Sequence, residues 1–328
     1  MSSENYFWHK KTWDQFSSAY AQNHLPHAIL LTGPQGVGKS LFSQKLVKSL
    51  LCENPVAESW HACNQCQGCK TYDSGANPDF MSVQLLEEKQ QIGVDQIRQV
   101  SRFLSYSRSF NAYRVVLIHP AERMNQHAAN SLLKSLEEPG DNTIIILTAT
   151  HLSNIIPTIK SRSQLLILSM PERNRAIEWL RTQKPDLENI EELLEISHGS
   201  PLIALNTSAE TIEKRKELAT DLLDVLEKNV SLTEIAKKWE KFDLETMLDW
   251  QIIWLQNILK RSSTANSISL QSAFQSKILA KLYKEIPVNS QWDLYQQLVL
   301  KKKILHTSVN AQINIENMLS LWLKESPI

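Results

Sequence analysis

The segment His27-Ala-Ile-Leu-Leu-Thr-Gly-Pro-Gln-Gly-Val-Gly-Lys-Ser40 determines how the rest of this chain is organised. Its apolar run, Ile29 to Leu31, predicts a short buried strand. Gly33 follows the strand, and after four more residues Gly38-Lys39-Ser40 completes the phosphate-loop pattern. Glycines let the backbone fold tightly enough for successive N–H groups to point at phosphate oxygens. A complete pattern between a predicted strand and a predicted helix indicates a P-loop fold.

The residues expected to hold a nucleotide lie within this loop and the first turn of the next helix. Lys39 would reach the outer phosphates as a point charge, and the Ser40 hydroxyl would bind Mg²⁺. The positive end of the helix also favours the anion. ATP with Mg²⁺ is therefore an expected ligand, and its candidate residues are Gly33, Gly36, Gly38, Lys39 and Ser40.

Composition narrows the class of protein. The 35 Lys and Arg residues balance the 35 Asp and Glu residues, which argues against a chain whose main role is to grip nucleic-acid phosphates. The 328 residues are too many for one ordinary core, so two or three domains are expected. The first residues lack the layout of a signal peptide, and the longest apolar run is too short to span a bilayer. We therefore expect a cytoplasmic protein without membrane contact.

All four cysteines fall between positions 52 and 69, as Cys52 and then Cys63, Cys66 and Cys69 at every third position. This distribution does not suit a disulfide-stapled secreted protein and suggests a metal site. Four thiolates around Zn²⁺ make a closed structural site with no open position for catalysis. An iron–sulfur cluster and unmetallated buried thiols are the alternatives. Zinc is the favoured prediction.

Strands and helices alternate beyond the cysteines. Apolar runs predict strands over 80–85, 115–118 and 143–150, with an amphipathic helix between the last two. This order predicts a mostly parallel sheet with helices on both faces. From about residue 209 the pattern is helical almost throughout, with apolar stripes typical of a core or a subunit interface.

The carboxylates of a P-loop ATPase are missing from their usual place. The strand at 115–118 should end in acidic residues that hold Mg²⁺ and orient the attacking water. His119 and Pro120 stand there instead. Glu122, two residues further on, is not expected to take the same place without a rearrangement of the loop. The sequence therefore predicts nucleotide binding without turnover.

Several segments together resemble bacterial clamp-loader subunits of the AAA+ class. The resemblance implies an α/β P-loop AAA+ domain over 1–169 with a zinc module at 52–69, a small helical lid domain over 170–208, and an all-α collar domain over 209–328. Ser163 departs from the Cys that the family usually has after its Ser-Arg pair. Besides the P-loop and the four-cysteine insertion, the segments that carry the resemblance are Leu25-Pro-His-Ala28, Asn130-Ser-Leu-Leu-Lys-Ser-Leu-Glu-Glu-Pro139 and Thr158-Ile-Lys-Ser-Arg-Ser163.

The resemblance also implies a function within the replicative DNA polymerase III holoenzyme. The degenerate acidic motif is similar to that of a non-hydrolysing subunit, which completes the loader ring and helps to load the sliding clamp on primed DNA. The implied partners are the gamma or tau ATPase subunits and delta, with the clamp and primed DNA as indirect partners. Arg162 would then be an arginine finger that reaches the γ-phosphate of a neighbour's ATP, since a guanidinium binds phosphate oxygens in a fork.

Other interpretations stay open at this stage. Without the family context, an arginine placed like Arg162 is more often part of a surface ion pair. The complete P-loop would also suit an independent ATPase motor that acts on DNA or protein, against which His119 and Pro120 argue. A nucleic-acid-binding role for the cysteine module is disfavoured by the neutral net charge and by the lack of Arg or Lys between Cys63 and Cys69.

Overall fold

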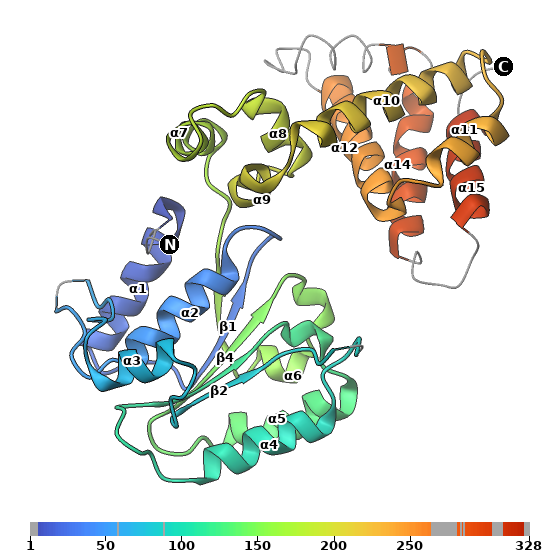
Figure 1. Cartoon of the computed structure of the whole chain (residues 1–328). Helices are drawn as coiled ribbons and strands as arrows, with labels where there is room; N and C mark the ends of the chain where they lie inside the picture. Colours follow the sequence, from blue (N-terminus) through green and yellow to red (C-terminus); the bar gives the residue numbers. More distant parts are fainter. Residues whose placement is uncertain are drawn as a thin grey trace. The chain divides into compact units, whose positions relative to one another are not determined.

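The computed structural model divides the chain into two compact units, residues 1–171 and 172–328. It describes residues 6–57, 59–87, 89–263, 281–282, 284, 286–303 and 311–324. Parts of the predicted collar range, among them 264–280, 304–310 and 325–328, lie outside the described residues. The first unit is a sheet flanked by helices, and the second is helical (Figure 1).

The first unit is built on a parallel sheet of five strands in the order β2-β3-β4-β1-β5. Every residue of β1, β3 and β4 is buried, because helices cover both faces of the sheet. The predicted parallel α/β sheet is confirmed. The strands are β1 (Ala28–Thr32), β2 (Phe80–Val83), β3 (Arg114–Ile118), β4 (Thr143–Ala149) and β5 (Gln164–Ile167).

Two helical layers sandwich this sheet (Figure 1). Successive side chains of β1 point to opposite faces, so Ile29 and Leu31 join the core under α1 and α2, whereas Leu30 joins the core under α4 and α5. The first layer contains α1 (Lys10–Ala21), α2 (Lys39–Leu50) and α3 (Gln67–Asp73), preceded by the short helix η1 (Phe7–His9). The second contains α4 (Val94–Ser105), η2 (Ala121–Arg123), α5 (Gln126–Glu137), η3 (Leu152–Asn154) and α6 (Pro157–Lys160).

The second unit has two separate apolar clusters in its described residues. One lies between α7, α8, α9 and the start of α10, and the other extends from α10 to α15. The predicted division of this unit into a lid and a collar at residue 208 stays a prediction. No helix in the described ranges is long and apolar enough to cross a bilayer. The helices are α7 (Arg173–Gln183), α8 (Ile190–Ile196), α9 (Pro201–Asn206), α10 (Ala209–Leu226), α11 (Leu232–Trp239), α12 (Leu244–Ser263), α14 (Val288–Lys303) and α15 (Ala311–Lys324).

A buried arginine lies where these two clusters meet. Arg215 of α10 is 2% exposed, and its Nη2 lies 3.4 Å from Glu195 Oε1 of α8. Asn257 of α12 donates to the same carboxylate oxygen at 2.9 Å, and the Arg215 guanidinium lies 5.8 Å from the ring centroid of Trp254. One polar group thus joins α8, α10 and α12.

Candidate functional site

The phosphate loop connects the carboxyl end of β1 to the first turn of α2. Gly36 and Gly38 have φ values of 73° and 95°, a backbone region that favours glycine. A Cβ on Gly33 would lie 2.4 Å from the carbonyl oxygen of Leu168, so a side chain does not fit there. The loop thus needs glycine at the three positions that the sequence pattern singled out.

Lys39 lies against the carbonyl groups of its own loop. Its Nζ donates to the carbonyl oxygens of Gly33 at 2.7 Å and Pro34 at 2.9 Å. Burial lowers the pKa of Lys39, and the nearby Glu122 carboxylate partly opposes that shift. Ser40 follows in the first turn of α2, so the structure brings all the predicted nucleotide-binding residues into one loop. Nucleotide binding itself stays a prediction.

The edge of the sheet beside the loop includes His119 and the carboxylate of Glu122. His119 at the end of β3 forms a hydrogen bond with the hydroxyl of Thr148 on β4. The Glu122 carboxylate accepts from the backbone N–H of Thr150 through Oε1 at 2.8 Å, and its Oε2 is buried without a hydrogen-bond partner among the described residues. Burial lowers the pKa of His119, while the charge of Glu122 acts to raise it. Glu122 lies at this edge because η2 turns the chain back against β4. Whether it can take the place of the missing carboxylates stays untested.

The N-terminal helix η1 contacts the phosphate loop, which the sequence did not predict. Trp8 Nε1 and His9 Nε2 both donate to the carbonyl oxygen of Val37, at 2.9 and 2.7 Å. The His9 ring packs edge-on against Phe42 of α2, with ring centroids 5.4 Å apart. Burial lowers the pKa of His9 to about 4, so this imidazole is neutral at pH 7. The aromatic run Tyr6-Phe-Trp8 is the sequence signal that could have pointed to this contact.

The four cysteines converge as the spacing predicted. All four Sγ atoms lie within 4.8 Å of one another. The Cys63–Cys69 and Cys52–Cys66 sulfur distances are 4.0 and 3.9 Å. Four sulfurs at about 2.3 Å from Zn²⁺ form a tetrahedron with edges of about 3.8 Å. The donor set and its spacing therefore fit one tetrahedral thiolate-bound ion.

Backbone N–H groups around the cysteines favour charged sulfur. The N–H groups of Cys66 and Cys69 donate to the Sγ atoms of Cys63 and Cys66, each at 3.4 Å. The N–H groups of Gln65 and Cys66 lower the pKa of the Cys63 thiol to about 6, whereas burial raises the pKa of the Cys69 thiol. A cation would be needed to ionise the buried thiols, and this chemistry fits a metal better than free thiols.

The cysteine module is fastened to the rest of the first unit. A Cβ on Gly68 would lie 2.1 Å from the carbonyl oxygen of Leu51, so glycine lets α3 approach the end of α2. Trp60, which is 2% exposed, stacks on Tyr20 of α1 with centroids 4.9 Å apart. Trp13 Nε1 of the same helix donates to the carbonyl oxygen of Ser59 at 2.8 Å. Trp60, between Cys52 and Cys63, is thus part of the core under α1.

Arg162 follows α6 and forms an ion pair within its own chain. Its Nη2 lies 2.7 Å from Oε1 of Glu137, the last residue of α5. Its Nη1 donates to the Thr158 carbonyl oxygen at 3.2 Å and to Ser161 Oγ at 3.3 Å. The guanidinium stands at an open hollow of about 720 Å³, whose lining residues are His27, Leu136, Glu137, Ser161, Arg162, Ser163 and Gln164.

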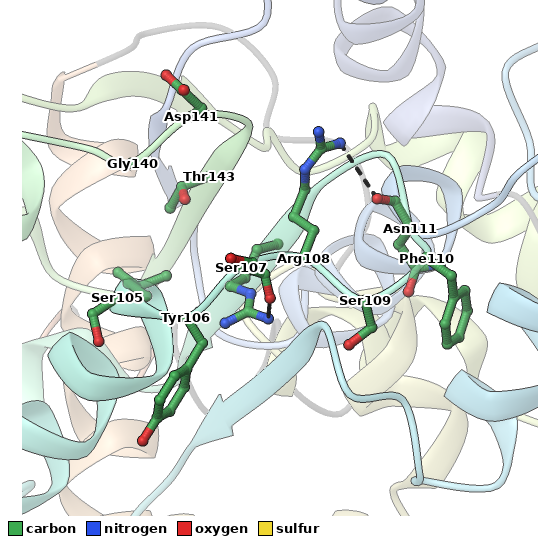
Figure 2. A pocket seen from close by; sticks show the side chains of 12 residues that line it. Ser105, Tyr106, Ser107, Arg108, Ser109, Phe110, Asn111, Gly140, Asp141 and Thr143 are labelled. Carbon is green, nitrogen blue, oxygen red and sulfur yellow. Dashed lines mark hydrogen bonds between the residues drawn. The ribbon is translucent and has the colours of Figure 1, made fainter.

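A second hollow, of about 590 Å³, lies beside the segment between α4 and β3 (Figure 2). The buried Asp79 carboxylate fixes this segment by accepting from the N–H groups of Ser109, Phe110 and Asn111, at 2.8, 3.2 and 3.1 Å. Arg114, 5% exposed in its side chain, completes the arrangement with Nη2 at 3.2 Å from Asp79 Oδ1. This buried pair could not be predicted from sequence, because Asp79 and Arg114 are far apart along the chain.

Comparison with known proteins supports one family. A family model described as "DNA polymerase III, delta subunit" matches residues 8–172, and one described as "DNA polymerase III, delta subunit, C terminal" matches residues 209–324. DNA polymerase III subunit delta′ of Pseudomonas aeruginosa is 32% identical over 326 residues, covering 97% of each chain. The delta′ subunit of Haemophilus influenzae is 32% identical over 80% of this chain and 79% of its own.

A subunit of another name also matches. DNA polymerase III subunit gamma of Buchnera aphidicola is 25% identical over 92% of this chain and 90% of its own. The family model over residues 8–172 spans the phosphate loop, the cysteines and Arg162, and the P. aeruginosa relative is similar along nearly the whole length. This chain therefore belongs to the family of DNA polymerase III delta′ subunits.

Proposed function

We propose that this chain is a non-hydrolysing subunit of a DNA polymerase III clamp loader that supplies Arg162 in trans to the ATP of a neighbouring ATPase subunit. It completes the loader ring and so helps to load the sliding clamp on primed DNA. Its partners are gamma or tau and delta subunits, in keeping with the names of its relatives. Its contact with the clamp and DNA is indirect.

The position of Arg162 on the sheet carries this proposal. Gln164 of β5 pairs with Ile29 near the start of β1, so Arg162 lies at the amino end of β1. The phosphate loop follows Thr32 at the other end of the same strand. Five strand residues separate the two edges by roughly 16 Å. Arg162 therefore cannot reach a nucleotide in its own loop, and a nucleotide held by another subunit is the fitting target.

The residues at the edge of the sheet beside the phosphate loop support the proposal that this chain does not hydrolyse ATP. Proline at position 120 offers no proton acceptor, and a neutral histidine is a poor Mg²⁺ ligand compared with oxygen. The Glu122 carboxylate is already bound through one oxygen to Thr150. ATP with Mg²⁺ would then serve as a structural ligand of the loop, and zinc as a structural ion of the cysteine module.

Replacing Arg162 tests the proposal directly. In the assembled loader, Arg162→Ala should leave co-elution of the subunits intact and slow DNA-stimulated ATP hydrolysis. Arginine fingers contribute about 10³ to 10⁵ in rate, so the neighbouring site should become silent and the total rate should fall by that site's share. Arg98→Ala is the matched control, because Arg98 forms an exposed ion pair with Asp95 at 2.9 Å. An unchanged rate with Arg162→Ala would contradict the proposal.

An independent ATPase motor is the second candidate, favoured by the complete phosphate loop and by Glu122 at its edge. If the chain is instead the non-hydrolysing subunit proposed above, the isolated chain should bind Mg-ATP without turnover. Lys39→Ala should then weaken ATP binding at least tenfold, because a charge-assisted hydrogen bond to phosphate is lost. Lys48→Ala, on the same helix and paired with Asp73, is the control. Calorimetry and phosphate release measure the two properties. Turnover that depends on Lys39 would favour the motor instead.

A further inference from the structure

The ion pair between Arg162 and Glu137 joins two elements at the hollow beside β5. We propose that Glu137 is a positioning residue for Arg162: its carboxylate holds the guanidinium in the orientation in which its remaining N–H groups meet a neighbour's nucleotide phosphate. The inference rests on the proposed function of Arg162 and deepens it. It assigns to the last residue of α5 a part in the hydrolysis that another subunit performs.

The geometry of the guanidinium supports this role. The group is planar and has five N–H donors in a fixed fork. Glu137 accepts from Nη2 at 2.7 Å, and Thr158 and Ser161 accept from Nη1 at 3.2 and 3.3 Å. Holding both Nη atoms fixes the plane of the group. Three donors at most are used within the chain, so at least two are left for a phosphate.

The acceptors themselves lie on well-anchored elements. His27 Nε2, just before β1, donates to the carbonyl oxygen of Leu136 at 3.1 Å and so ties the end of α5 to the sheet. The Ser161 hydroxyl donates to the Thr158 carbonyl oxygen at 3.1 Å. Ile159 of α6 is 1% exposed in the core that α5 shares. Glu137 is thus the acceptor that orients Arg162 from another element, whereas Thr158 and Ser161 belong to its own segment.

Glu137 has two opposite effects on phosphate binding by Arg162: it orients the guanidinium, and it neutralises part of its charge. We expect the first effect to be the larger. A long arginine side chain loses conformational entropy when it binds, and an arginine already held in place loses less. The negative charge of Glu137 opposes phosphate binding, but its side chain is 49% exposed, so water and salt screen that opposition. Water and salt do not weaken the other effect of Glu137, which is to align the N–H donors of the guanidinium. Removing Glu137 should consequently slow the neighbour's reaction.

The test uses the assembled loader with Glu137→Ala, and Glu138→Ala as the matched control. Glu138 is the adjacent exposed carboxylate and forms no ion pair among the described residues. The part of the maximal DNA-stimulated ATPase rate that Arg162→Ala abolishes is the share of the neighbouring site. We expect Glu137→Ala to lower that share about threefold, within the range of an exposed pair, and to leave the half-saturating ATP concentration unchanged. Glu137→Gln, which keeps an acceptor oxygen, should retain most of the rate. Glu138→Ala should behave as the wild type.

Two further measurements separate positioning from a structural role. In the Arg162→Ala background, Glu137→Ala should have no additional effect, because there is no guanidinium left to orient. In the isolated chain, Glu137→Ala should speed the modification of Arg162 by phenylglyoxal, followed by peptide mass spectrometry. This second readout reports the pair without any neighbour.

Each outcome has a definite meaning. An unchanged or raised rate with Glu137→Ala, or an equal loss in the Arg162→Ala background, would overturn the positioning role while leaving Arg162 as the finger. Unchanged phenylglyoxal reactivity would show that Glu137 does not hold the guanidinium, and would also overturn it. If Arg162→Ala itself has no effect on the rate, the proposed function fails, and the positioning role falls with it.

Discussion

Removal of the zinc proposed for the four-cysteine site should melt the segment between Cys52 and Cys69 and destabilise the whole first unit. Four thiolates that share one cation repel each other once it is gone, and the buried thiol of Cys69 must then be protonated. The module also holds Trp60 in the core under α1, so its melting exposes an aromatic cluster. The expected effect therefore exceeds that of the metal bonds alone.

Structural zinc contributes about 10 to 16 kcal/mol to folding in isolated zinc-finger peptides. We expect the parallel sheet, which has its own apolar core, to stay folded without the module, so that only part of such a value is lost. A loss of at least about 3 kcal/mol would lower the Tm of a unit of this size by roughly 6 to 12 °C.

Metal analysis of the freshly purified protein, followed by thermal unfolding before and after chelation, measures both the metal and its effect. Restored Zn²⁺ should recover the Tm, whereas added Mg²⁺ should not, because thiolates are soft ligands. Cys69→Ser should reproduce the chelated state. Protein that contains no zinc as purified, or iron with the absorbance of a cluster, would contradict the assignment.

Replacing Asp79 by Ala should destabilise the first unit by about 3 to 5 kcal/mol. The carboxylate satisfies three backbone N–H groups and the Arg114 guanidinium, and all four donors are left without it. The charge of Arg114, which is 5% exposed in its side chain, then lacks its carboxylate partner, and this is the largest part of the loss. Urea unfolding measures the loss. Asp95→Ala is the control: its pair with Arg98 is exposed, so a change below about 0.5 kcal/mol is expected there.

The same carboxylate gives the stability a dependence on pH. Burial on its own raises the pKa of Asp79, but the three N–H donors and Arg114 outweigh it and hold the pKa below its ordinary value. The ionised form is therefore favoured in the folded chain. Its contribution is fully present above the unfolded pKa, about 4, and is lost as the pH falls through the lower folded value. Asp79→Asn should flatten this acid branch of the unfolding curve; an unaltered branch would mean that another carboxylate causes it.

The parts of this molecule that could be predicted from sequence are those with local spacing. The phosphate loop, the buried strand before it and the convergence of Cys63, Cys66 and Cys69 all follow from residues within a few positions of each other. Their geometry depends on turns that the chain makes locally, such as the positive φ of Asn64 at 61°.

The parts that could not be predicted depend on contacts across the sheet. Asp79 meets Arg114 only because β2 and β3 are neighbours, and Arg162 meets Glu137 only because α5 and α6 end side by side. The hydrogen bond from the Thr150 N–H to Glu122 likewise depends on the direction in which η2 turns against β4. Periodicity and motifs carry no information on such pairings.

The buried guanidinium of Arg215 has a mechanical consequence for the second unit. Sliding α8 away from α12 would strip this cation of Glu195 while it is still enclosed by apolar side chains, which is a strongly unfavourable state. The α7–α9 cluster, α10 and α12 should thus move together as one rigid body. A displacement applied to that cluster would be passed along the 18 residues of α10, about 27 Å, rather than absorbed where the clusters meet.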